Sequence, residues 1–195
     1  MQNSENKRQV SRVREIVFMG IMIALDVLAV RFLSVETPVM RVGLGFLANI
    51  IAGMYLGPAR AGIVGLLADL VGFFMFPKGT FFPGFTISAA VNGILAGYFL
   101  EGRKSANFKW FVSYAILSTL LVDTLMNTIW LVMMLHNGDM SFFWTRLSIR
   151  IPNQVVVTAL KIIMVPLLYN TVFKRLRAVG VERPGIRESS AKSIN

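Results

Sequence analysis

Arg146 and Arg150 are the residues whose type and spacing point most directly to binding chemistry. Residues four apart lie on the same face of a helix, so these two guanidinium groups would project side by side. A guanidinium binds a carboxylate through two parallel hydrogen bonds. The pair therefore predicts a site for an anionic ligand. The alternative is that each arginine reaches out to a lipid phosphate.

Polar residues inside apolar runs suggest a second kind of contact. Asp26, Asp69 and Asp123 lie in such runs, where an acid is costly and usually faces the interior of a bundle. We expect Asp69 to accept hydrogen bonds from a heterocycle, and Asp26 to be structural or paired with an arginine. Asn127 and Trp130 would share a helix face, where an indole stacks on a flat ring and an amide bonds its edge. Ordinary helix packing explains that spacing equally well.

An aromatic segment broken by proline and glycine lies at residues 73–86. Proline lacks the amide N–H and glycine admits positive φ, so we expect the helix to stop at Pro77 and a new one to start only after Thr86. Aromatic side chains on such a turn predict a lid over a flat ligand, or alternatively a set of aromatics at the membrane interface. The residues expected to meet a ligand here are Lys78, Phe82, Pro83, Phe85 and Thr86.

The elements that must position these residues are membrane spans. The chain has 195 residues, of which 55% are hydrophobic and 15% charged, whereas about a quarter are charged in an ordinary soluble domain. A span needs about 20 apolar residues, and the apolar runs predict helices at 16–33, 42–56, 61–76, 87–100, 110–135 and 147–173. We therefore expect an all-α integral membrane bundle of six transmembrane helices. Residues 16–175 would form it, between tails at 1–15 and 176–195.

The distribution of basic residues predicts the orientation. With six spans, fourteen of the 20 Lys and Arg fall on the side of the two termini, which the positive-inside rule places in the cytoplasm. Five fall on the opposite, outer side and one, Lys161, lies within the last span. The five bring positive charge to all three outer connections, which again favours an anionic ligand. They are Arg31, Arg41, Lys78, Arg146 and Arg150.

Several functions are excluded by what the sequence lacks. There is no cysteine and one histidine, His136, so thiolate chemistry and a multi-histidine metal site are not expected. Phosphate-binding loops, metalloprotease motifs and a Ser-His-Asp set are also missing. We expect no enzyme, no catalytic residue, no metal and no ATP hydrolysis by this chain. The net charge of +10 does not indicate a nucleic-acid partner, because the basic residues lie between apolar runs.

The order of several motifs resembles a known family. They are Arg41-Val-Gly-Leu-Gly-Phe46, Gly57-Pro58, Ala68-Asp69-Leu-Val-Gly72 and Phe82-Pro83-Gly84-Phe85-Thr86, followed by Asn127-Thr-Ile-Trp130 and Arg146 with Arg150. Together they are similar to the folate-specific substrate-binding (S) component of energy-coupling factor (ECF) vitamin transporters. A lysine is frequent in that family where this chain has Arg150, which preserves the charge.

Gly20 and Ala24 form a small-xxx-small pattern, which lets another helix approach closely. They stand where the family carries a helix-docking motif, so the resemblance implies that they meet a partner. The implied partners in the lipid bilayer of a prokaryotic cell membrane are a transmembrane coupling subunit (EcfT type) and two ATPase subunits (EcfA type). ATP would be used by the ATPase subunits, with no cofactor in this chain.

The resemblance implies that the bundle captures folate from outside and that toppling of the bundle delivers it inward. Aromatic side chains suit the pterin, Asp or Asn its edge, and the outer arginines the glutamate carboxylates. Three alternatives remain at this stage. They are an S component for another vitamin, such as a different pterin or pantothenate, a small proton-coupled carrier that uses the intramembrane aspartates, and a structural membrane subunit with no ligand.

Overall fold

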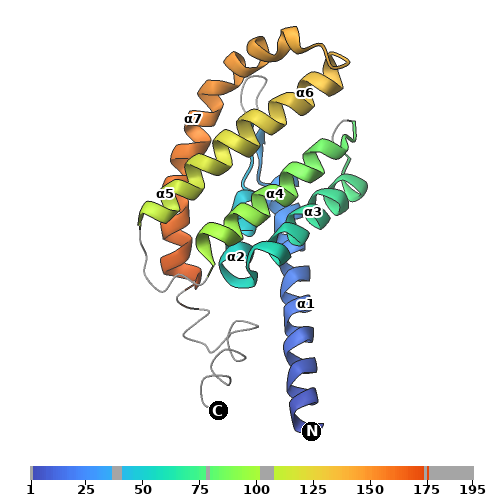
Figure 1. Cartoon of the computed structure of the whole chain (residues 1–195), viewed down its shortest axis with the longest axis vertical. Coiled ribbons are helices and arrows are strands. Elements are labelled where there is room, and N and C mark those ends of the chain that lie inside the picture. Colours follow the sequence, from blue (N-terminus) through green and yellow to red (C-terminus); the bar gives the residue numbers. More distant parts are fainter. Residues whose placement is uncertain (1, 37–40, 78–79, 102–107, 174, 176–195) are drawn as a thin grey trace.

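The computed structural model describes residues 2–36, 41–77, 80–101, 108–173 and 175. For residues 2–8, 11, 35, 36, 41, 42 and 173 it describes the backbone alone. The described chain is all-α apart from one two-residue ladder, in which β1 (Val35–Glu36) pairs antiparallel with β2 (Arg41–Val42) in the register Val35 to Val42. Figure 1 shows the elements arranged as a bundle, with the start of α1 and the end of α7 at the same end.

Six continuous helical segments make up the described bundle, as the sequence predicts. The first four are α1 (Gln2–Arg31), α2 (Phe46–Leu56), α3 (Pro58–Met75) and α4 (Pro83–Leu100). The fifth joins α5 (Phe108–Leu117), the π-helix η1 (Ser118–Met126) and α6 (Asn127–Leu135). The sixth joins the 3₁₀ turn η2 (Met140–Phe142), α7 (Phe143–Leu168) and the π-helix η3 (Tyr169–Phe173).

Several predicted boundaries are wrong, for identifiable reasons. Helix α4 begins at Pro83 rather than after Thr86, because proline at the first helical position needs no N–H donor and already has a helical φ. The same rule starts α3 at Pro58 instead of residue 61. Helix α2 begins at Phe46 rather than residue 42, because Val42 is paired in β2.

Four of the segments are long and apolar enough to cross a membrane: Pro58–Met75, Pro83–Leu100, Phe108–Leu135 and Met140–Val172. Helix α1 runs through charged residues at its N-terminal half, and α2 has 11 residues, which extend for about 16 Å at 1.5 Å per residue. Helix α2 is too short to span a bilayer of about 30 Å. Burial among other helices removes that requirement.

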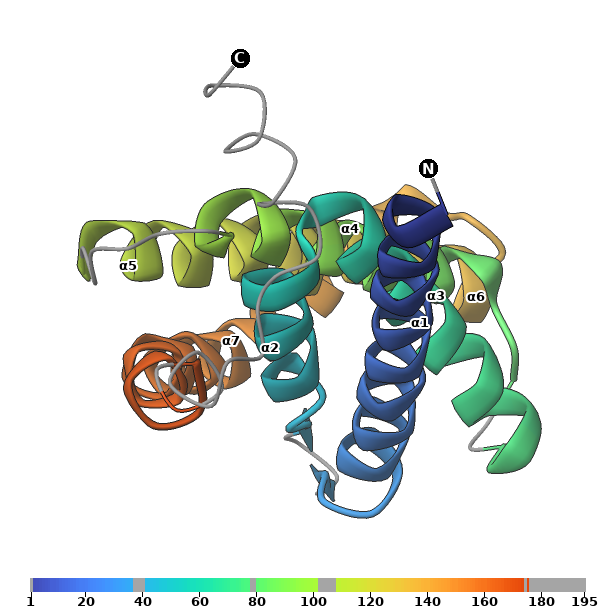
Figure 2. The same ribbon diagram turned by 90° about the horizontal axis from the view of Figure 1, so that it is seen from below.

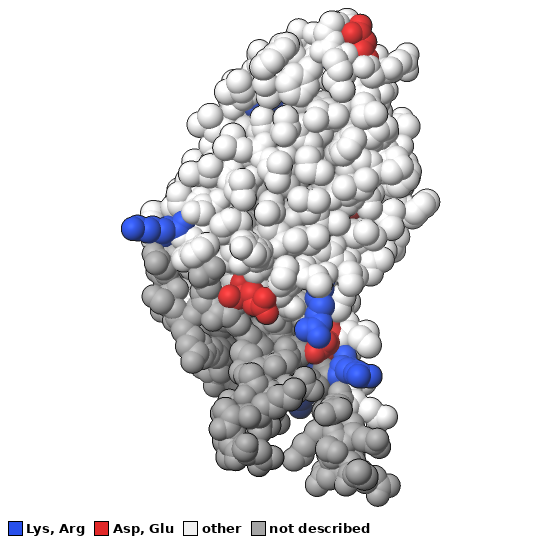
Figure 3. All heavy atoms as spheres, in the orientation of Figure 1, with Lys and Arg blue, Asp and Glu red and all other residues white. Residues whose placement is uncertain are grey.

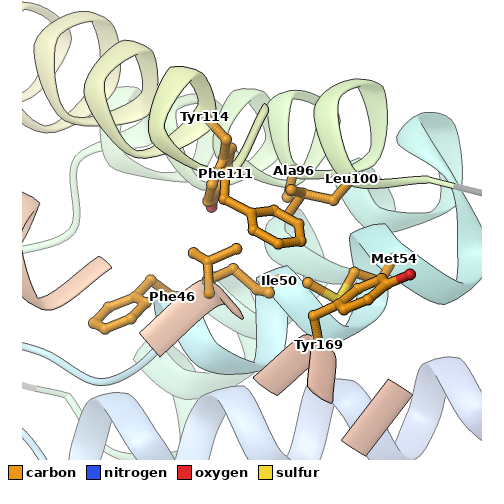
Figure 4. Packing of buried hydrophobic residues seen from close by; sticks show 9 residues of the cluster. Phe46, Ile50, Met54, Ala96, Leu100, Phe111, Tyr114 and Tyr169 are labelled. Atoms are coloured by element: carbon orange, nitrogen blue, oxygen red, sulfur yellow. The ribbon is translucent and has the colours of Figure 1, made fainter. Parts of the chain in front are cut away.

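Helix α2 lies at the centre of the bundle, and nine of its side chains or glycines are buried. Seen from below in Figure 2, it lies between α1 and α7. One face packs into a cluster with α4, α5 and α7 that includes Ile50, Leu100 and Tyr114 (Figure 4). The opposite face packs against α1 and α3, with Tyr55 next to Met22 and Val64 in the same cluster. Two cores therefore share one central helix.

Helices α3 and α4 approach so closely that glycine is required between them. A Cβ on Gly93 would meet the backbone carbonyl of Ala61, and a Cβ on Gly97 would meet the backbone of Pro58. On the next interface, a Cβ on Gly53 of α2 would lie 2.7 Å from the Cβ of Ala96. Backbone-to-backbone contact of this kind is typical of helices that associate in lipid.

The outer surface of the described bundle is largely apolar. Most of the described surface seen in Figure 3 is uncharged, with an acidic group at the top, a basic group at the left at mid-height and several charges of both signs lower down. Large hydrophobic side chains are exposed along every long helix, including Ile21, Tyr98, Leu120 and Ile163. Such a surface suits lipid or a membrane partner.

Candidate ligand-binding site

The predicted site residues gather at one end of the bundle, opposite the start of α1. The β1–β2 ladder, the connection between α3 and α4 and the connection between α6 and α7 all lie in the upper half of Figure 1. Helices α3, α4, α6 and α7 therefore each contribute one terminus to this end.

Asp69 and Thr86 are in contact across the α3–α4 interface. The hydroxyl of Thr86 donates to a carboxylate oxygen of Asp69 at 2.6 Å. Because α4 begins at Pro83, Thr86 lies in its first turn and faces α3. Two residues predicted separately as ligand contacts thus form one hydrogen-bonded pair, which fixes the direction of the Asp69 carboxylate.

Trp130 lies against the first turn of α4. Its indole N–H donates to the hydroxyl of Ser88 at 3.0 Å, and its ring centroid is 6.0 Å from that of Phe82. A Cβ on Gly84 would lie 2.6 Å from the Cγ of Trp130, so only glycine lets the indole pack here. Phe85 lies on the other side of Phe82, with the ring centroids 6.1 Å apart. An aromatic group is thereby built on the Phe-Pro-Gly-Phe-Thr segment.

Asn127 precedes Trp130 by three residues, on the first turn of α6. Its side-chain oxygen is buried and has no hydrogen-bond partner in the described part of the chain. A buried amide oxygen without a partner carries a desolvation cost of about 1–3 kcal/mol. A ligand that brings an N–H donor to this position would remove that cost.

The guanidinium group of Arg146 contacts the imidazole ring of His136. Its Nε lies 3.2 Å and its Nη2 3.0 Å from the Nε2 of His136, which accepts when its proton is on Nδ1. The imidazole stacks on Phe142 with 4.0 Å between centroids and an interplanar angle of 7°. In the same connection, the backbone N–H of Ser141 bonds the Asp139 carboxylate at 3.0 Å, which lowers the pKa of Asp139.

Arg150 makes a different contact, one turn further along α7. Its Nη2 donates to the backbone carbonyl of Asp123 at 2.9 Å. Gln154 donates to the same carbonyl at 3.2 Å. The two guanidinium groups at 146 and 150 thus contact different acceptors, one an imidazole and the other a backbone carbonyl.

The remaining predicted residues fall into three groups. Lys78 lies outside the described residues, and Arg41 is described by its backbone in β2 alone. Pro83 is exposed at the start of α4, next to the aromatic group. Gly20 and Ala24 are exposed on α1, away from this end, and a Cβ on Gly20 would meet nothing within 4 Å.

Four residues of this end were missed by sequence reasoning. Gly84 and Ser88 are four apart on α4 and together seat the indole of Trp130. Their i, i+4 spacing was available as a signal. His136 was considered for metal binding alone, although it lies ten residues before Arg146. Gln154 continues the spacing of Arg146 and Arg150 by another four and could have been included on that basis.

The described helices thus carry an aromatic group, a buried amide and two arginines. The chain belongs to the family of ECF transporter substrate-specific components, whose model matches residues 14–176. This family consists of transport components rather than enzymes, which confirms the prediction that the chain is not an enzyme.

Two similar proteins and one similar solved structure carry the name FolT. Folate transporter FolT of Clostridium novyi is 40% identical over 136 residues, which cover 70% of this chain and 78% of the relative. Folate transporter FolT of Leuconostoc mesenteroides is 30% identical over 128 residues, 64% of this chain and 67% of the relative. Among solved structures, a crystal structure of FolT bound with folic acid matches with a TM-score of 0.70 and 30% identity. That match covers 80% of this chain and 92% of the other.

Proposed function

We propose that this chain is the folate-binding S component of an ECF transporter. The observation that carries the proposal is the structural match to FolT bound with folic acid, over 80% of the chain. The site supports it independently. It offers aromatic rings at Phe82 and Trp130 for a flat ring, the unpartnered amide oxygen of Asn127 for a ring N–H, and arginines for carboxylates.

The fold supports the transport setting of the proposal. Four helices are long and apolar enough to span a membrane, and we propose that α1 and α2 complete the six-segment membrane bundle, with the short α2 enclosed among the other helices. The side of the bundle that holds both termini carries fourteen of the 20 Lys and Arg, so we propose that both termini are cytoplasmic in a prokaryotic cell membrane. The binding end then faces outward, where the vitamin is captured.

The test of this proposal is equilibrium binding of folic acid to the purified protein in detergent, with thiamine, riboflavin and pantothenate as controls. We expect saturable binding of folic acid near one to one, at submicromolar affinity, which corresponds to more than about 8 kcal/mol. The controls should not bind. If one of the other vitamins binds instead, the assignment as an S component is kept and its substrate is changed. If none of the four compounds binds, the proposal is contradicted.

The assignment of the arginines is tested by comparing folate with pteroate, which lacks the glutamate. Arg146→Ala and Arg150→Ala should each weaken folate binding by about tenfold or more, because a charge-assisted contact to a carboxylate is lost. Pteroate binding should change less than about threefold. Thr145→Ala is the matched control, since Thr145 is exposed beside Arg146 on α7. Equal losses for both ligands would remove the carboxylate assignment.

Delivery inward would require the coupling subunit (EcfT type) and the two ATPase subunits (EcfA type). Gly20 and Ala24 lie on an exposed, largely apolar face of α1 that includes Ile21 and Leu28. We propose that this face docks the coupling subunit through close helix contact.

Gly20→Leu and Ala24→Leu should therefore abolish folate uptake by the assembled transporter while folate binding to the isolated chain survives. Ile63→Leu, at an exposed apolar position of α3, is the control. Uptake that persists in the α1 variants would contradict the docking assignment. If folate uptake needs no ATPase subunit and is abolished by an uncoupler, a proton-coupled carrier is favoured instead.

A further inference from the structure

The interface between the fifth and sixth helical segments contains a cluster of polar groups that the proposed ligand contacts do not use. Lys161 of α7 is 1% exposed. Its ammonium lies 2.5 Å from a carboxylate oxygen of Asp123 and 3.1 Å from the hydroxyl of Ser118, with the Thr119 hydroxyl at 3.4 Å. A buried ion pair adds little net stability over an apolar pair of similar volume, and its best attested use is to specify one arrangement.

The backbone at Asp123 shows what this arrangement is. In an α-helix, the N–H of Asn127 would bond the carbonyl four residues earlier, that of Asp123. In this chain it bonds the carbonyls of Val122 and Thr124 instead, because η1 is π-helical. The carbonyl of Asp123 therefore does not accept from the N–H of Asn127. A carbonyl has two lone pairs and can accept from a donor on a neighbouring helix.

Two side chains of α7 supply that donor. Arg150 donates to the Asp123 carbonyl at 2.9 Å and Gln154 at 3.2 Å. Arg150, Gln154 and Lys161 are spaced by four and seven residues, so they lie along one face of α7. All three bind Asp123, two at its backbone and one at its carboxylate. The π-helical turn and this face of α7 form one joint.

We propose that Asp123, held by Lys161, is a positioning residue that fixes the guanidinium of Arg150 for the anionic end of the ligand. A guanidinium is planar, so one bond from its Nη2 restricts the plane in which the other donors point. The ion pair at Lys161 fixes Asp123 in turn, since it ties the π-helical turn to α7 about three turns further on. This inference rests on the proposed function for the ligand, whereas the joint itself does not.

The first experiment compares folate and pteroate affinities in four variants. Asp123→Asn with Lys161→Met removes both charges together and leaves no buried charge unpaired. This double variant should bind folate about tenfold more weakly and pteroate within about threefold of the native protein. Gln154→Leu leaves the ion pair intact and should weaken folate by about threefold.

Conservative variants provide the controls. Lys161→Arg retains the charge and should keep the native ratio of folate to pteroate affinity, while Thr119→Val removes only the longest contact of Lys161 and should change neither ligand. A role confined to stability would lower the thermal unfolding temperature without moving the ratio. If the ratio of folate to pteroate affinity is unchanged in the double variant, because neither ligand or both equally are weakened, the positioning role is overturned.

A second experiment needs no ligand and so separates this inference from the proposed function. The chain has no cysteine, and Met133 of α6 and Ile151 of α7 are exposed at 43% and 50%. Cysteines placed there and spin-labelled report the distance between the two helices in detergent. We expect a single narrow distribution in the native background and a broader one in the double variant. If the distance distribution of the double variant is as narrow as that of the native background, the joint is overturned, even if folate binds. If the distribution broadens in a protein that binds no folate, the joint is retained and the proposed function is rejected.

Discussion

The two halves of the bundle are held together by different means. Helices α2, α3 and α4 meet through glycines, where a Cβ on Gly53, Gly93 or Gly97 would run into a neighbouring backbone or its Cβ. The fifth and sixth segments meet through polar side chains, with Lys161 and Arg150 bound to Asp123. The glycine contacts depend on the absence of a side chain, whereas the polar contacts depend on two groups of opposite character. We therefore expect that a second substitution can restore stability lost at the ion pair, but not stability lost at a glycine.

The largest effect should come from filling the α3–α4 interface. Gly93→Val would drive a β-branched side chain into the backbone of Ala61, and overpacking of this severity costs about 3 kcal/mol or more. We expect loss of monodisperse protein in detergent, or a much lower thermal unfolding temperature.

Gly20→Val is the matched control for this variant, because a Cβ at Gly20 would meet nothing within 4 Å. Its unfolding free energy should change by less than about 0.5 kcal/mol. Equal behaviour of the two variants would mean that the glycines of α3 and α4 are not selected for close approach.

A smaller loss of stability, which a second substitution should restore, is expected where the fifth and sixth segments meet. Lys161→Met alone leaves the Asp123 carboxylate, whose side chain is 23% exposed, without its cation. Removing one partner of a buried pair costs about 3 kcal/mol, and the partial exposure of Asp123 should reduce this. Adding Asp123→Asn should recover most of the lost unfolding temperature. Additive losses in the double variant would contradict the contrast between the halves.

The smallest effect is expected from a single hydroxyl of the same cluster. Ser118→Ala removes one hydrogen bond to Lys161 and one to the carbonyl of Ala115. Since the ammonium keeps Asp123, the unfolding free energy should fall by about 1 kcal/mol. Denaturation of Ser118→Ala and Lys161→Met in the same detergent shows which substitution lowers the unfolding free energy more. A loss as large as that of Lys161→Met would place the stability in the hydroxyl rather than in the ion pair.

The sequence predicted the number of helical segments, because the length of each apolar run sets where a helix can lie. The site assignment stays a prediction, since the described contacts join its residues in separate pairs. Boundaries were less predictable where proline begins a helix. At Pro83 the same residue type can end one helix or start the next, and the choice depends on Thr86 reaching Asp69 across the interface.

The partners of the arginines could not be predicted. A spacing of four describes where Arg146 and Arg150 leave α7, but their acceptors come from other elements. One acceptor is an imidazole of the preceding connection, and the other is a backbone carbonyl within the π-helical turn. The π-helical turn lies within one continuous apolar run, so the run predicts a helix but does not show which backbone hydrogen bonds that helix makes.

The connection between α2 and α3 is short. Gly57 alone joins the two helices, with φ at 81°, and a Cβ there would lie 2.8 Å from the carboxylate of Glu101 at the end of α4. Consecutive Cα atoms are about 3.8 Å apart, so a one-residue link keeps the end of α2 close to the start of α3. Any side chain at this position would both adopt a strained φ and displace Glu101. The short connection therefore depends on glycine.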